Sequence, residues 1–125
     1  MAHRILVADD EAPIANVVAL KLRNAGFEVI VARDGQEAYE LAIADRPDFI
    51  ITDLQMPVMN GLELCTRLAA EIQGGIPTIL LTAKRFEIDP KTVAHLPIRR
   101  VMSKPFSPRE LLAAVQEALG AAMNQ

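Results

Sequence analysis

The sequence predicts an α/β domain built on a central parallel sheet. Five short runs rich in β-branched residues alternate with segments in which apolar residues recur at helical spacing. Most of the short runs are apolar on both faces, which is typical of strands covered by helices on both sides. A chain in which the β-α unit is repeated five times in this way is expected to form right-handed crossovers between parallel strands.

The strand candidates are short, and each is followed by a helical segment. The strands are expected at residues 5–8, 28–32, 48–52, 78–82 and 100–103. The helices are expected at residues 13–25, at 35–44, after residue 60, between 90 and 96, and from 108 to about 119. Since parallel strands need a crossover of a dozen or more residues, this order of elements favours one parallel sheet.

The first three helices carry recognisable start and stop signals. Gly26 is expected to end the first helix, because glycine readily adopts the conformation that closes a helix. Asp34 followed by Glu37 predicts a capped start for the second helix. Asn60 followed by Glu63 repeats that pattern before the third helix.

The last two helices differ in how clearly the sequence marks them. Pro90 can begin the fourth helix, but Pro97 must end it by about residue 95 or 96, so a short helix is expected. The fifth helix begins with Ser107 as cap, Pro108 in the first position and Glu110 in the third. An apolar stripe then runs through this helix to about residue 119.

Length, charge and composition set limits on function. The 125 residues suffice for one domain, which we expect over 1–125, with a core at about 3–119 and a short tail at 120–125. The net charge of −3 and the 4% aromatic content argue against nucleic-acid binding. One cysteine excludes an internal disulfide, and two distant histidines disfavour a histidine metal site. We see no signal peptide or membrane span, so a cytoplasmic protein is expected.

Chemically active side chains follow four of the five predicted strands. They are Asp9, Asp10 and Glu11 after the first strand, Asp53 after the third, Thr82 and Ala83 at the end of the fourth, and Lys104 and Pro105 after the fifth. In an open α/β sheet, ligands bind at the carboxyl ends of the strands. These side chains are therefore expected to meet at one edge of the sheet.

This combination suits phosphoryl transfer. Asp9, Asp10 and Asp53 would repel one another unless a cation joined them, and their hard oxygen ligands suit Mg²⁺. A carboxylate beside Mg²⁺ can act as the nucleophile toward a phosphoryl group, whose oxygens Lys104 and Thr82 could then neutralise. Ala83 is small and would leave access to the site.

Each of these residues also has an ordinary structural explanation. Asp9 or Asp10 could cap the first helix, and Asp53 could be a turn residue. Thr82 could be a strand-end hydroxyl, and Lys104 could be a solvated loop residue. Their agreement on one edge of the sheet is what favours a functional site.

Four motifs give the chain a family resemblance. They are VADDE at 7–11, DLQMPVMNG at 53–61, LLTAK at 80–84 and SKPF at 103–106. With these motifs the chain resembles the receiver domains of response regulators in two-component signalling, over essentially its whole length. The resemblance implies a flavodoxin-like, doubly wound (βα)5 fold with strand order 2-1-3-4-5.

The resemblance also assigns roles to the acids. Asp53 would be the phosphoacceptor. Asp10, Asp53 and the backbone carbonyl of Gln55 would hold Mg²⁺, with Asp9 helping directly or through water.

The remaining motif residues would serve the phosphoryl group. By resemblance, Thr82 would be the switch hydroxyl and Lys104 would pair with a phosphoryl oxygen. Pro105 would shape the following loop, with a cis Lys-Pro bond as one form. Gln55 and Lys84, each two residues past a key residue, are expected to tune the lifetime of the phosphoryl group.

The chain departs from the family pattern in its second half. Val101 stands where a Tyr or Phe usually lies, and valine has no ring to report the state of the switch. Phe86 could substitute for that ring or could be simple filling. Arg99, Arg100 and Arg109 could make the partner face basic, and we expect an acidic protein partner there.

We therefore expect a phosphorylation-driven switch and not a turnover enzyme. Its phosphoryl donor would be a sensor histidine kinase or a phosphotransfer protein, and its downstream protein partner is unknown.

The sequence leaves several alternatives open. The domain could stand alone or be a piece of a larger regulator or hybrid kinase. An aspartyl phosphatase is a rival, but Gln55 replaces the second acid that such enzymes commonly carry. A nucleotide- or flavin-binding domain is a further rival, although acids stand where a glycine-rich loop would be needed.

Overall fold

The computed structural model describes residues 3–83 and 88–123. Five strands and five helices alternate along the described chain, in the order β1 (Arg4–Ala8), α1 (Ala12–Asn24), β2 (Glu28–Ala32), α2 (Gly35–Asp45), β3 (Phe49–Asp53), α3 (Gly61–Glu71), β4 (Thr78–Thr82), α4 (Pro90–Ala94), β5 (Ile98–Ser103) and α5 (Pro108–Met123). All neighbouring strands pair in parallel, in the order β2-β1-β3-β4-β5. The predicted fold class and strand order are confirmed.

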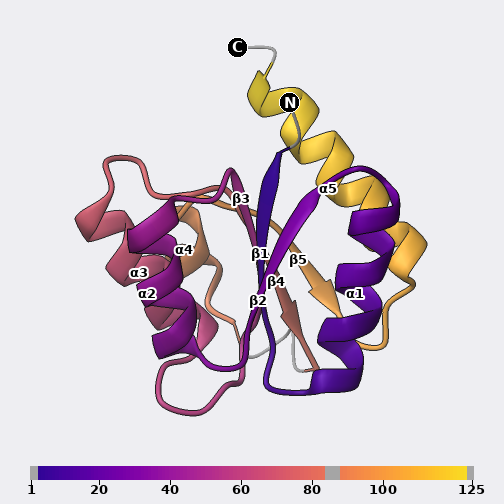
Figure 1. Ribbon diagram of the computed structural model, residues 1–125. Helices are drawn as coiled ribbons and strands as arrows, with labels where there is room; N and C mark the ends of the chain where they lie inside the picture. The colour runs from indigo at the N-terminus through magenta and orange to yellow at the C-terminus, as the bar shows by residue number, and fades with distance from the viewer. Residues whose placement is uncertain (1–2, 84–87, 124–125) are drawn as a thin grey trace.

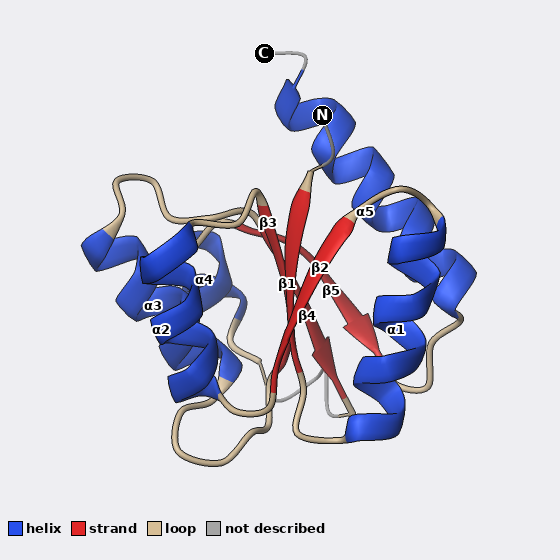
Figure 2. Cartoon of the chain, viewed as in Figure 1, coloured by secondary structure: helices blue, strands red, loops and turns tan. Residues whose placement is uncertain are grey.

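Helices cover both faces of the sheet. Helices α1 and α5 lie together on one face, and α2, α3 and α4 lie on the other (Figure 1). The strands run in one direction, so the carboxyl ends of β1, β3, β4 and β5 lie at one edge of the sheet, the lower edge in Figure 2. Among the described residues, no helix is long and apolar enough to cross a membrane.

The core is split by the sheet into two halves. Along β1, Ile5 and Val7 pack toward the α1/α5 face, whereas Leu6 and Ala8 pack toward the α2/α3 face. This alternation follows from the two-residue period of a strand. Every residue of β3 and β4 is buried, so the central strands hold the edge residues that follow them in fixed positions.

The predicted helix caps are present. The Asp34 carboxylate accepts a hydrogen bond from the Glu37 N–H at 2.8 Å, and Asn60 and Glu63 form a complete capping box. Helix α4 is as short as predicted, with five residues, and Asp89 caps it by accepting a bond from the Lys91 N–H.

Several predicted boundaries are wrong by one or more residues. The first strand begins at Arg4, the first helix spans Ala12–Asn24, and the fifth strand begins at Ile98, two residues before its expected start. The third strand begins at Phe49 and ends at Asp53, one residue later than expected at each end. Helix α5 continues to Met123 and does not end near residue 119. Gly120 does not stop it, because a glycine within a helix costs only about 1 kcal/mol and the following residues, Ala-Ala-Met, are strong helix formers.

Candidate functional site

The acids after β1 differ in their exposure. Asp9 is only 2% exposed, and its N–H donates to the Ala32 carbonyl, which extends the pairing of β1 with β2. The Asp9 carboxylate accepts a hydrogen bond from the Glu11 N–H at 2.9 Å. Asp10 and Glu11 are exposed. One buried and two exposed carboxylates therefore follow the same strand.

Asp53 is the last residue of β3 and is 5% exposed. The backbone just beyond it is fixed, since the Leu54 N–H donates to the Leu81 carbonyl at 2.7 Å and the Leu54 carbonyl accepts from the Gly61 N–H at 2.8 Å. A Cβ at position 61 would lie 2.5 Å from the Asp53 carbonyl oxygen, so only glycine fits there. The turn after β3 thus holds Asp53 closely.

Lys104 joins the acids from the other end of the chain. Its Nζ lies 3.3 Å from Asp53, 3.4 Å from Asp9 and 3.3 Å from Glu11, and its side chain is 13% exposed. The Lys104 N–H donates to the Thr82 carbonyl at 2.9 Å, which anchors the residue at the end of β4. The Lys104–Pro105 bond is cis, as the resemblance implies, and Pro105 is exposed.

Burial sets the electrostatics of this site. It raises the pKa of Asp53 from 3.8 to about 6, and Lys104 offsets only part of this rise. Burial likewise raises the pKa of Asp9. Burial alone would lower the pKa of Lys104, but the carboxylates of Asp53 and Asp9 outweigh it and the net direction is upward. Burial thus disfavours the charged forms of Asp9 and Asp53, and Lys104 does not fully offset this.

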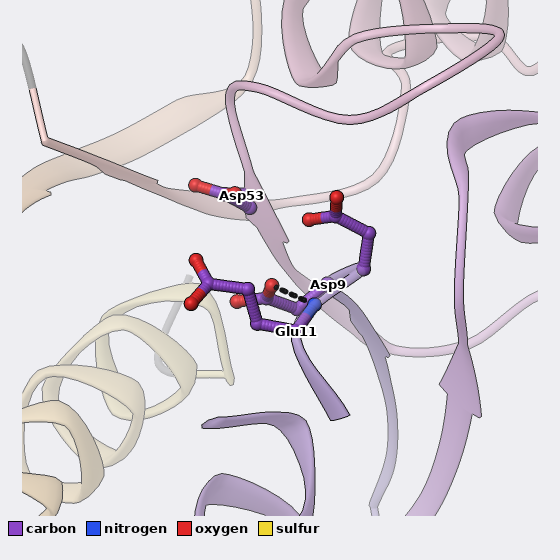
Figure 3. A group of neighbouring side chains, drawn as sticks. Asp9, Glu11 and Asp53 are labelled. Carbon is purple, nitrogen blue, oxygen red and sulfur yellow. Dashed lines mark hydrogen bonds between the residues drawn. The ribbon is translucent and has the colours of Figure 1, made fainter. Parts of the chain in front are cut away.

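The four carboxylates are close enough to share one cation. Asp9, Asp10, Glu11 and Asp53, which we call the acidic cluster, each offer an oxygen within 4.8 Å of the others. Figure 3 shows the side chains of Asp9, Glu11 and Asp53 gathered beside the loop after β1. A small hard cation such as Mg²⁺ fits this all-oxygen donor set and would relieve the repulsion within it.

Three further predicted site residues, Thr82, Ala83 and Gln55, lie at the same edge of the sheet as the acidic cluster. Thr82 is fully buried at the end of β4, level with Ser103 of β5, and Ala83 beyond it is exposed. Gln55 is exposed two residues past Asp53. Lys84 and Phe86, predicted to tune the site and to replace the missing ring, lie outside the described residues.

The predicted partner face contains an irregularity that the sequence did not indicate. The pairing of β4 with β5 shifts between Ile98 and Arg100, so Arg99 is an extra residue at a β-bulge. Arg99 and Arg100 are both exposed, whereas Val101 is half-buried. Arg109, at the start of α5, is also exposed.

Comparison of the sequence with known protein families supports a functional role for this site. The family model described as the response regulator receiver domain matches residues 5–116. The chain belongs to this family. Receiver domains are signalling switches and not enzymes in the usual sense. The acidic cluster and Lys104 of this receiver domain therefore lie at the edge of the sheet where the motifs predicted them.

Solved structures from several organisms are similar to this receiver domain. A chemotaxis response regulator of Vibrio cholerae, CheY4, is 31% identical, with a TM-score of 0.82, and the match covers 94% of this chain and 99% of that one. The response regulator TrrA of Thermotoga maritima, solved in complex with Mg²⁺-BeF, is 29% identical, with a TM-score of 0.82 and the same coverage. A CheY-like receiver domain from Methanospirillum hungatei shares the fold, with a TM-score of 0.88 at 23% identity over 99% and 98% of the two chains.

The sequence assigns no role of its own to Glu11, although the residue lies in the site. Glu11 was grouped with the acids after the first strand, but its ion pair with Lys104 joins residues 93 positions apart. One signal in the sequence could have pointed to Glu11. It stands directly before a helix, where Ser, Thr, Asp or Asn are the usual capping residues and Glu is not.

Proposed function

We propose that this receiver domain accepts a phosphoryl group on Asp53 from the phosphohistidine of a sensor histidine kinase or phosphotransfer protein. The observation that carries the proposal is the position of Asp53, buried beside Lys104 and within the acidic cluster. The family to which the chain belongs and the motif around Asp53 support the same role.

The acids supply the nucleophile and the metal ligands. Asp53 attacks phosphorus with one carboxylate oxygen, the bond from phosphorus to the histidine nitrogen breaks, and the histidine keeps the electron pair. Asp9, Asp10, Asp53 and the backbone carbonyl of Gln55 would hold Mg²⁺. When bound, the metal neutralises negative charge on the phosphoryl oxygens. The similar TrrA structure, solved with Mg²⁺-BeF, supports this choice of ion.

The remaining groups stabilise the transferred phosphoryl group. Lys104 needs little movement to pair with a phosphoryl oxygen, since its Nζ already lies 3.3 Å from Asp53. Thr82 would supply the hydroxyl that responds to phosphorylation, from the end of the neighbouring strand. The exposed Ala83 leaves the approach to Asp53 open. Gln55 and Lys84 would set how fast water removes the phosphoryl group.

A groove beside the site offers the donor a place to approach. Its volume is about 510 Å³, and its wall includes Glu11 and Lys104 on the side of the acidic cluster. The rest is mainly apolar, with Ile14, Val17 and Phe106 among its residues. A donor whose histidine reaches Asp53 would contact this groove. An apolar surface on the donor would then bind favourably against the apolar groove residues.

The output of the switch would be a changed affinity for a downstream protein. We place this contact on α4 and β5, where Val101 replaces the usual ring and Arg99 and Arg100 are exposed. Two adjacent positive charges favour an acidic partner. Charge reversal at both arginines is expected to abolish binding of that partner, and unchanged binding would contradict this placement.

The phosphoacceptor is tested by incubation with Mg²⁺ and a small phosphodonor such as acetyl phosphate. The wild-type protein should take up one acid-stable, base-labile phosphoryl group, and Asp53→Asn should take up none. Asp34→Asn is a matched control, because asparagine caps a helix as well as aspartate and Asp34 lies outside the acidic cluster. Equal labelling of Asp53→Asn would overturn the assignment. Steady turnover of phosphate esters would favour a phosphatase.

A further inference from the structure

Glu11 occupies a helix start without serving as a cap. It is the N-cap residue of α1, yet its side chain makes no capping hydrogen bond within the described chain. An aspartate would bring the same negative charge to the helix and would also cap it. The Glu11 carboxylate instead lies 3.3 Å from Lys104 Nζ. The longer side chain is therefore explained by its contact with Lys104 and not by the needs of the helix.

The three carboxylates around Lys104 are not equivalent. Those of Asp9 and Asp53 are buried, whereas the Glu11 side chain is 58% exposed at the wall of the groove. A cation held by the acidic cluster would neutralise Asp9 and Asp53 more than the exposed Glu11. Glu11 would then be the carboxylate that competes most strongly for the Lys104 ammonium.

Building on the proposed function, we propose that Glu11 is a positioning residue that competes with the phosphoryl group for Lys104. In the unmodified domain its carboxylate lies as close to the ammonium as Asp53 does, at 3.3 Å. Phosphorylation of Asp53 places a phosphoryl anion near the same ammonium, so two anions then compete for one lysine. Glu11 therefore lowers the stability of the phosphorylated state, and removal of its charge frees Lys104 for the phosphoryl group.

The first test measures the affinity of the full chain for beryllofluoride, a mimic of the phosphoryl group, in saturating Mg²⁺ by titration calorimetry. Glu11→Gln is expected to bind about two- to fivefold more tightly, the range for a partly exposed ion pair. Glu117→Gln makes the same change in net charge at an exposed position of α5 and should bind as the wild type does. Equal affinity of Glu11→Gln and the wild type would overturn the proposal.

A double-mutant cycle separates competition from simple repulsion. If Glu11 acts through Lys104, the effect of Glu11→Gln should disappear in a Lys104→Met background. An effect that is as large or larger without Lys104 would mean that Glu11 merely repels the anion, and the proposal would be wrong.

A spectroscopic measurement covers the case in which Lys104→Met binds too weakly to measure. The NMR signals of the Lys104 CεH₂ group should shift in Glu11→Gln and stay unchanged in Glu117→Gln, with no ligand present. Unchanged Lys104 signals in Glu11→Gln would overturn the proposal. Failure of the wild type to bind beryllofluoride or accept a phosphoryl group would instead overturn the function proposed for Asp53, so the two failures are distinguishable.

Discussion

The acidic cluster and the α4–β5 edge, formed by Pro90–Ala94 and Ile98–Ser103, are built in opposite ways. The cluster follows β1 and β3, and every residue of β3 is buried. No residue of α4, all of which the structure describes, is buried, and β5 carries one buried residue, Met102. Buried strands therefore hold the acidic cluster in place, whereas the α4–β5 edge buries few of its own residues.

This difference separates two requirements of a switch. Transfer of a phosphoryl group needs side chains held in fixed positions, which buried strands provide. A change of partner affinity needs a segment that moves at low cost, and segments with little buried apolar surface are the ones that open most easily. The bulge at Arg99 lies in this second region and leaves one residue of β5 outside the regular pairing with β4.

The largest effect expected from this contrast is on stability. Phe49→Ala in β3 should lower the free energy of unfolding by about 3–5 kcal/mol, because Phe49 is fully buried and its truncation would leave a cavity in the core. Val93→Ala in α4 should change it by less than about 1 kcal/mol, since Val93 is half-buried and alanine favours the helix. Chemical denaturation of the two variants measures the difference directly. Similar losses in both would show that α4 is held as firmly as β3.

The sequence predicted the rigid region better than the labile one. Asp53, Thr82 and Lys104 follow strands whose apolar character is plain, so their common edge could be inferred from topology alone. The pair formed by Glu11 and Lys104 could not be inferred, because it depends on where two loops meet across 93 residues.

The bulge at Arg99 was missed for a different reason. Periodicity shows which residues alternate within one strand, but register depends on pairing with the neighbouring strand. Arg99 and Arg100 are adjacent in the sequence, but their common exposure in one strand is seen only in the structure.

A second prediction concerns the cost of burying Asp53. The pKa of Asp53 is about 6 in the folded chain, raised by burial above the ordinary 3.8. Between about pH 4 and 6 the folded state therefore binds more protons than the unfolded state, and the free energy of unfolding falls as the pH rises. Asp53→Asn removes this penalty. It should raise the free energy of unfolding at pH 7 by about 1–2 kcal/mol, which is less than the full rise in pKa corresponds to, because the asparagine amide must also be buried.

The pH profile identifies the source of this gain. The decline between pH 4 and 6 should become shallower in Asp53→Asn without vanishing, because burial also raises the pKa of Asp9. A wild-type stability that rises through this pH range would mean that Lys104 compensates the buried charge of Asp53 in full, and the cluster would then have no excess charge for a cation to relieve.

The smallest effect expected is at Val58, in the turn between Asp53 and α3. Val58 has a φ of 71° and is 78% exposed, so a β-branched residue adopts a strained backbone conformation with little burial in return. Val58→Asn should raise the free energy of unfolding by about 0.5–1 kcal/mol, because asparagine tolerates this conformation, while Val58→Ala should gain less. A loss of stability in Val58→Asn would instead mean that the valine side chain packs usefully against Leu41 and Ala44, which lie with it along one groove. The expected gain would show that the rigid side of the molecule is firm enough to hold a strained residue in the turn that follows its proposed phosphoacceptor.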